Sequence, residues 1–157
     1  MYIMKLLNIK WVLILLCIPF MTACWEDLPA YEDAEITKVG FYYRFAGPET
    51  DPVTDEPIIV EKELSCSYNI NSEAATVDVD VTVPEANGSF TETERNNVSI
   101  TKLWGYVNVS TAAKVEPVDG SPKLGTPGDW SSPRKYKVIA ANGNTKVWTI
   151  TVKSLNK

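Results

Sequence analysis

The clearest pattern in the chain is a strict alternation of apolar and polar residues between positions 76 and 83. Valine occupies every second position, and the positions between are polar: Val77, Val79, Val81 and Val83 alternate with Asp78, Asp80 and Thr82. A period of two is typical of a β-strand with one face in a core and the other in water. The pattern therefore predicts an amphipathic strand whose two aspartates are solvated.

Stretches rich in β-branched and aromatic residues predict six further strands, over residues 36–45, 58–68, 98–109, 113–118, 134–140 and 146–152. Segments rich in proline and glycine at 47–57 and 119–133, and a polar segment at 84–97, separate them as loops. No long window after residue 24 has helical spacing. About seven short strands predict an all-β fold, namely an immunoglobulin-like antiparallel β-sandwich.

The last two predicted strands form a hairpin with Asn142-Gly143 in its turn. A plain two-residue turn would place Trp148 on the opposite face from Tyr136, because a shift of one residue reverses every side chain. We therefore expect Gly143 in a left-handed conformation, and a bulge that brings Val138 opposite Trp148.

The N-terminal segment has the pattern of a bacterial lipoprotein signal peptide. Lys5 and Lys10 precede ten apolar residues, 11–20, which are too few to cross a membrane. Small residues at Thr22 and Ala23 then lead directly to Cys24. We expect cleavage before Cys24 and lipidation of its thiol; an ordinary signal peptide cut near Ala23 is the second interpretation.

This assignment divides the chain into a signal peptide (1–23), a flexible acidic tether (24–34) and a sandwich domain (35–157). Without the signal peptide the chain has 13 basic and 20 acidic residues, a net charge of −7. That sign argues against binding nucleic acid or an anionic lipid surface. The membrane is therefore expected to be a partner only through the lipid on Cys24.

The composition also argues against catalysis. The chain has no histidine, which removes the commonest general base and the commonest zinc ligand. Cys66 would be the single free thiol and is expected to be a small buried residue. Four carboxylates in the 47–57 loop do not have the spacing of a calcium-binding loop. We expect no enzymatic activity, no cofactor and no metal site.

The end of the chain resembles small immunoglobulin-like domains of Bacteroidota surface lipoproteins. The resemblance lies in Asp129-Trp130-Ser131, the Tyr136-Lys137-Val138 strand, the Asn142-Gly143 turn and the strand 146–152, and it extends over roughly residues 76–153. Glu26 and Asp27, directly after Cys24, resemble the acidic signal that directs such lipoproteins to the cell surface. Together these features imply an outer-membrane lipoprotein facing the cell surface, with a domain of uncharacterised function that is often found among surface proteins that bind or import glycans. The resemblance supplies no catalytic residues.

Three aromatic residues are candidates for ligand binding. Trp104 and Tyr106 lie two apart on one strand and so share a face, and Trp130 lies in a loop that could present it. A sugar ring stacks its apolar face on such side chains, while polar neighbours meet its hydroxyls. Core packing is the more common role for Trp104 and Tyr106, and Trp130 could instead close the end of the sandwich. Trp148 alternates with Ile150 and Val152 and is expected in the core.

These observations favour a lipid-anchored surface module that binds glycan beside an outer-membrane transporter. The alternative is a structural or adhesive lipoprotein that contacts another surface protein through a sheet edge or loops. Exposure of the aromatic side chains distinguishes the two functions: if all three are buried, glycan binding loses its support from the sequence. These side chains are Trp104, Tyr106 and Trp130.

Overall fold

The computed structural model describes residues 31–157; predictions that fall on residues 1–30 lie outside the described part. The described chain contains nine strands, one short α-helix and one 3₁₀-helix. They are β1 (Ile36–Thr50), β2 (Pro57–Glu63), β3 (Ser65–Asn71), β4 (Thr76–Thr82), α2 (Glu92–Asn97), η2 (Ile100–Lys102), β5 (Leu103–Val109), β6 (Lys114–Val118), β7 (Pro127–Gly128), β8 (Arg134–Ile139) and β9 (Thr145–Asn156).

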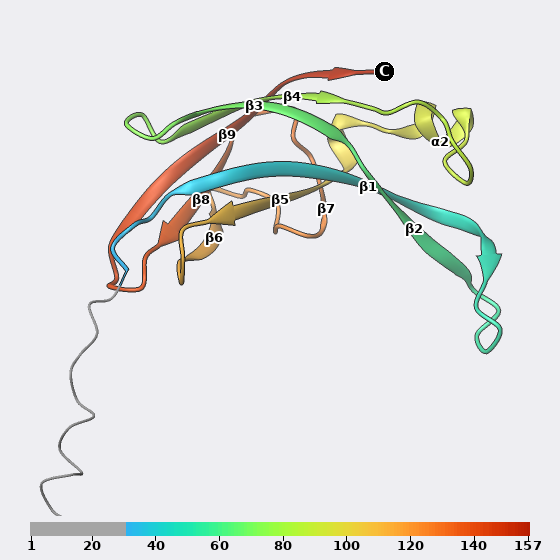
Figure 1. Ribbon diagram of the computed structural model, residues 1–157, viewed down its shortest axis with the longest axis horizontal. Helices are drawn as coiled ribbons and strands as arrows, with labels where there is room; N and C mark the ends of the chain where they lie inside the picture. The colour runs from blue at the N-terminus through green and yellow to red at the C-terminus, as the bar shows by residue number, and fades with distance from the viewer. Residues whose placement is uncertain (1–30) are drawn as a thin grey trace, which may run out of the picture. The chain divides into compact units, whose positions relative to one another are not determined.

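The strands form two sheets, with orders β2-β1-β5-β7 and β3-β4-β9-β8-β6. Figure 1 shows β1 as one long curved strand of the first sheet, with β3, β4 and β9 in the layer beside it. The predicted all-β sandwich is confirmed, although the sheets are not wholly antiparallel, because β4 pairs with β9 in parallel. The alternation that predicts strands does not reveal the direction of their partners.

The core lies between the inner faces of the two sheets. The valines of the alternating stretch are at most 2% exposed, as the pattern predicts. Opposite them, β1 turns four large side chains inward at every second position, namely Val39, Phe41, Tyr43 and Phe45. The side chains at the intervening positions of β1, and those at alternate positions of β5, therefore point out of the sandwich, and this outer face carries the candidate site.

The predicted single strand over residues 58–68 is two strands that belong to different sheets. β2 pairs with β1, and β3 pairs with β4. The change occurs at Leu64, whose side chain is buried and whose backbone N–H donates to the carbonyl of Phe41. This break, together with the two-residue β7, raises the strand number above the seven expected.

The segment predicted as a polar loop, 84–97, contains α2. Thr91 caps this helix, and its hydroxyl accepts the backbone N–H of Glu94. Thr91 and Glu94 have the Thr-x-x-Glu spacing of a capping box, and this spacing is the one sign of the helix in the sequence. The helix has six residues and none of them is buried, so it lacks the apolar stripe by which helices are recognised.

The β8–β9 hairpin confirms the left-handed Gly143, which has φ +91°. Its register differs from the prediction: Trp148 pairs with Tyr136, not with Val138. The Ala140 N–H donates to the Asn144 carbonyl, so the loop consists of residues 141–143 and begins one residue earlier than expected. The observed register differs from the predicted one by two residues. Because side chains alternate with a period of two, both strands keep the predicted core faces.

The last residues of the predicted tether belong to the compact unit, which spans Tyr31–Lys157. Ala34 is buried, and its carbonyl accepts the indole N–H of Trp148 at 2.9 Å. The Glu35 carboxylate pairs with the Lys146 ammonium at 2.5 Å. The Tyr31 carbonyl likewise accepts the Asn142 N–H, so the described part of the predicted tether is hydrogen-bonded to the β8–β9 hairpin. In residues 31–157, no helix has the length and apolar character needed to cross a membrane.

Candidate functional site

The predicted lipidation residue, Cys24, and the predicted export signal, Glu26 and Asp27, lie outside the described residues. The structural analysis of the site therefore concerns the three aromatic candidates.

Trp130 is a core residue, so of the two roles left open for it the structure favours packing inside the sandwich over ligand contact. Its side chain is 2% exposed. The ring meets Phe41 edge-on at a centroid distance of 4.8 Å and stacks on Tyr136 at 5.9 Å. Its indole N–H donates to the Leu103 carbonyl at 3.2 Å, which satisfies the buried polar group.

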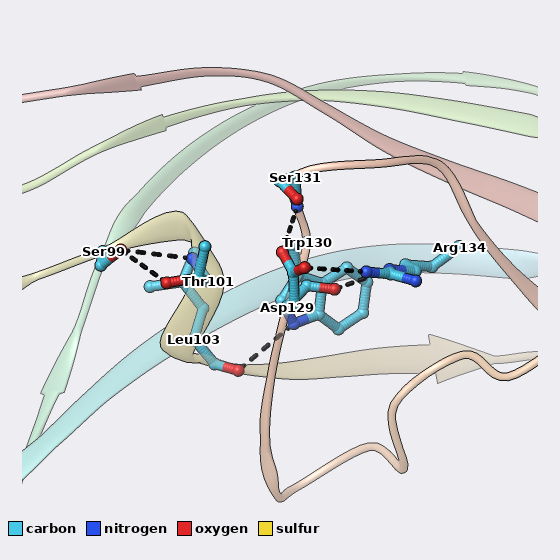
Figure 2. A network of polar contacts seen from close by, with 7 residues as sticks. All are labelled: Ser99, Thr101, Leu103, Asp129, Trp130, Ser131 and Arg134. Atoms are coloured by element: carbon cyan, nitrogen blue, oxygen red, sulfur yellow. Dashed lines mark hydrogen bonds and ion pairs between the residues drawn. The ribbon is translucent and has the colours of Figure 1, made fainter.

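The loop around Trp130 is held by its neighbours, as Figure 2 shows. One carboxylate oxygen of Asp129 accepts the Ser131 N–H at 2.9 Å, and the Arg134 guanidinium donates to the Asp129 carbonyl at 2.6 Å. Hydrogen bonds from Ser131 lower the pKa of the Asp129 carboxyl. The loop directs Trp130 inward, where Gly105 leaves room: a Cβ there would lie 2.2 Å from the indole.

Trp104 and Tyr106 share the outer face of β5, as their spacing predicts. Both are half-buried, and neither belongs to the core cluster, so the expectation of core packing is wrong for both. Leu103 and Gly105 occupy the inner face instead. The sequence shows that the two aromatic residues lie together, but it does not show on which side of the sheet.

Tyr106 fills a notch in the outer face rather than offering a free ring. It lies opposite Gly40, where a Cβ would come within 2.2 Å of the phenol. Its ring stacks on Tyr42 at 4.8 Å, and the Lys38 ammonium lies 5.5 Å from its centroid. Lys38 and Tyr42 flank Gly40 on one face of β1, so the ring has neighbours on both sides.

The hydroxyl of Tyr106 is also engaged. It donates to the Glu63 carboxylate at 3.0 Å. Burial, followed by this hydrogen bond, raises the pKa of the Tyr106 phenol. Tyr106 therefore connects β5 to β2 across β1 and supports the sheet.

Trp104 has a different environment. It pairs with Tyr42 across the β1–β5 ladder. Within residues 31–157 its ring stacks on no other aromatic side chain, and its indole N–H has no protein acceptor. Of the three predicted residues, Trp104 alone retains both the ring and the donor for another molecule.

Trp104 forms one wall of a surface hollow of about 540 Å³. The hollow lies where β1 extends past the start of β5 and meets α2 and η2. We call it the Trp104 hollow and define it by six side chains: Arg44, Ile59, Glu94, Asn97, Lys102 and Trp104. Ile59 is 62% exposed, so the hollow combines an aromatic wall, an aliphatic rim and four polar groups.

The polar groups of the hollow are partly held in place. The Glu94 carboxylate accepts the Tyr43 hydroxyl at 2.7 Å, and burial together with this bond raises the pKa of Tyr43 to about 12. The Arg44 guanidinium pairs with Glu61 at 2.5 Å. Lys102 forms no ion pair among residues 31–157. The hollow therefore offers fixed acceptors and one uncommitted cation beside an aromatic face.

The sequence did not identify the residues that surround Trp104. Asn97 and Glu94 come from the short helix inside the segment predicted as a loop, and Lys102 comes from η2. The capping signal at Thr91 could have located α2, but no pattern in the sequence places that helix beside β1.

The remaining candidates for chemistry have structural explanations. Asp51 lies in the acidic loop, where its carboxylate accepts the N–H groups of Val53 and Thr54, and these bonds lower its pKa. Cys66 is half-buried, and burial raises the pKa of its thiol. In the described part of the chain, no three metal-binding side chains converge on one point.

Comparison with known proteins places the chain in a family. Residues 36–151 match the profile of the family described as DUF5018-related. The chain belongs to the DUF5018-related family. A crystal structure of a candidate secreted protein from Bacteroides fragilis is 54% identical and superposes with a TM-score of 0.76, covering 82% of this chain and all of that one. No match was found among curated proteins. This DUF5018-related chain is therefore similar to a candidate secreted protein of Bacteroides, which agrees with the expected resemblance to Bacteroidota proteins.

Proposed function

We propose that the protein is a lipid-anchored, cell-surface module that binds carbohydrate in the Trp104 hollow. The observation that supports this function is the environment of Trp104 at the wall of a polar hollow: its indole is half-exposed and, within residues 31–157, has neither a stacked aromatic ring nor a hydrogen-bond acceptor. A sugar ring needs an aromatic face for its C–H surface and polar groups for its hydroxyls.

The surrounding groups fit a hydroxyl-rich ligand. Asn97 supplies both a donor and an acceptor, Glu94 supplies acceptors, and Lys102 supplies three donors. Glu94 is already oriented by Tyr43, so it needs little reordering to meet a ligand. The hollow is an open depression on a sheet face, and such a site is suited to one side of an oligosaccharide.

We propose binding without catalysis. The chain has no histidine. The carboxylate that lines the hollow is Glu94, which already accepts a hydrogen bond from Tyr43. Among the described residues, no second acidic side chain lines the hollow. Hydrolysis of a glycosidic bond usually requires a pair of carboxyl groups.

The proposed location rests on the N-terminal sequence and on the relative. A lipid on Cys24 would hold the domain at the outer membrane, and Glu26 and Asp27 would direct it to the outer leaflet. The similarity to a candidate secreted Bacteroides protein supports export. An outer-membrane transporter for the bound glycan is the proposed neighbour.

A glycan array tests the binding function. The domain beginning at Tyr31 is compared with its Trp104→Ala variant and with Tyr106→Phe, which keeps the stacked ring and removes one hydroxyl. We expect the unmodified domain and Tyr106→Phe to bind the same oligosaccharides, and Trp104→Ala to lose them. Absence of binding to every sugar would reject this function in favour of protein contact through an edge or loop.

A further inference from the structure

The edges of the two sheets differ in how they are protected. Exposed edge strands present unpaired N–H and C=O groups, and proteins block them with charge, proline or short length. The edge strands β2 and β6 carry such residues, and β7 has only two residues, one of them proline. The blocking residues are Pro57, Glu61, Lys62 and Glu63 in β2, Lys114, Glu116 and Pro117 in β6, and Pro127 in β7.

The edge strand β3 carries none of these features. It has seven residues, Ser-Cys-Ser-Tyr-Asn-Ile-Asn, without charge or proline. It pairs with β4 on one side and lies at the end of its sheet on the other. The free part of β5, Tyr106–Val109, is shorter, because Gly125 donates to the Gly105 carbonyl. In a chain with a net charge of −5, an uncharged seven-residue edge is a place where two copies can approach without repulsion.

The residues of β3 are also complementary to themselves. Antiparallel pairing of two copies about a two-fold axis at Tyr68 places Tyr68 opposite Tyr68 of the second copy. Cys66 then faces Ile70, and Ser67 faces Asn69. Cys66 and Ile70 both pack against the core, so this register joins apolar to apolar on the inner face and polar to polar on the outer face.

The pairing also has natural ends. The nearest charged residues along the chain are Glu63 and Glu73, which lie outside the strand. At Leu64 the chain leaves for the other sheet, so pairing stops at Ser65 before these carboxylates meet. We propose that β3 is a self-association edge, through which two copies of the chain join their five-stranded sheets into one continuous sheet. A closed two-fold dimer covers both β3 edges and leaves the charged edges outside.

The proposed register can be tested with cysteine pairs in the full chain kept in mild detergent. Replacing Cys17 and Cys24 by serine leaves Cys66 as the single thiol. Adding Ile70→Cys creates two inter-copy pairs, Cys66 with position 70 of the other copy. We expect mild oxidation to convert most of this variant to a covalent dimer.

Two single-thiol chains are the matched controls. One keeps Cys66 alone, and the other combines Ile70→Cys with Cys66→Ala. In the proposed register, equivalent thiols of the two copies lie four residues apart along the strand, roughly 13 Å, which is too far for a disulfide. Both controls should remain monomers on a non-reducing gel.

A charge substitution supplies the second readout. Tyr68→Lys places two ammonium groups opposite each other, and it should reduce the cross-linked fraction of the Ile70→Cys chain by about tenfold or more. Val147→Lys adds the same charge at an exposed position of β9 and should have no effect. Circular dichroism checks that each variant is folded.

The outcomes distinguish the proposal from its alternatives. The proposal is supported if covalent dimers form in the chain with thiols at positions 66 and 70, do not form in the single-thiol chains, and decrease with Tyr68→Lys. Equal cross-linking in the single-thiol chains, or folded monomers at the highest soluble concentration, would overturn it. Sugar binding by the monomeric domain is measured separately, so neither result depends on the other.

Discussion

Two glycines on neighbouring strands place the aromatic side chains of the four-stranded sheet. Gly105 leaves space on the inner face for Trp130, and Gly40 leaves space on the outer face for Tyr106. In both cases a Cβ would lie 2.2 Å from an aromatic ring. The consequences differ, because Trp130 is fixed in the core while Tyr106 is half-exposed and can swing outward.

Because of this difference, we predict that replacing glycine by alanine lowers the free energy of unfolding by different amounts at the two positions. Gly105→Ala should lower the free energy of unfolding by about 1–3 kcal/mol, the usual cost of overpacking a core. Gly40→Ala should cost less, since the obstructing atoms belong to the far end of the Tyr106 side chain. Urea unfolding of the two variants measures both values. Equal costs would show that Tyr106 is as rigidly held as Trp130.

Tyr43 predicts a stability loss at alkaline pH. Its pKa in the folded protein is raised to about 12, from 10.0 for a free phenol. Between these values the unfolded chain releases a proton that the folded chain retains, so the stability contributed by Tyr43 is complete below pH 10 and is lost as the pH rises toward 12. Tyr43→Phe should be less stable near neutral pH and should show a shallower decline over that window. Unfolding midpoints measured across the window, for both chains, test this.

At the scale of elements, the sequence pattern predicts a strand correctly where one face of the strand is exposed to solvent and the other is buried. The alternation at 76–83 predicts β4 and its buried valines correctly, and it requires no knowledge of the partner strand. The division of 58–68 at Leu64 could not be predicted in this way, because each half satisfies strand preferences and the change of sheet is a tertiary event. The same holds for α2, whose position beside β1 creates the Trp104 hollow.

The segment before β1 is a structural element that the sequence does not suggest. Ala34 accepts the Trp148 indole N–H, and Glu35 pairs with Lys146. A chain that starts at Ile36 would leave the buried indole donor unsatisfied, and it should be less stable than one that starts at Tyr31 by about 1–3 kcal/mol.

The matched control for this truncation is Lys146→Gln in the longer chain. It removes the partly exposed ion pair with Glu35 and the cation–π contact of the Lys146 ammonium with the Trp148 ring, 4.8 Å from its centroid, but it keeps the Ala34 acceptor, and it should cost about 1–2 kcal/mol. Thermal or urea unfolding of the three chains gives the comparison. A stability of the Ile36 chain equal to that of the longer chain would show that residues 31–35 contribute nothing.

At the scale of the whole molecule, the proposed function joins a membrane anchor to a binding domain. Cys24→Ala should abolish lipidation and release the protein from membranes, and it should leave the sandwich folded, because Cys24 precedes the compact unit that begins at Tyr31. Palmitate labelling and membrane fractionation of cells that produce either form measure this. A variant that still incorporates palmitate and remains in the membrane would contradict the anchor.

The candidate site shows how far residue patterns extend at this scale. The pairing of Trp104 and Tyr106 on one face follows from their spacing and is correct. Their different roles depend on Gly40 and on the helix that supplies Glu94 and Asn97, and both are set by packing between distant segments. The loop position of Trp130 leaves both exposure and burial open, and Gly105 and the Asp129 network, which no sequence pattern reveals, turn it inward.

The most direct test of the central claim is a ¹H–¹⁵N spectrum of the tryptophan indoles in the domain beginning at Tyr31, during titration with the oligosaccharide that binds best on the array. This domain contains three tryptophans: Trp104, Trp130 and Trp148. The indole N–H groups of Trp130 and Trp148 are buried and donate to backbone carbonyls, so they serve as internal controls. We predict that the Trp104 indole signal shifts with ligand concentration while the other two stay in place. An unmoved Trp104 signal at saturating sugar would contradict the account.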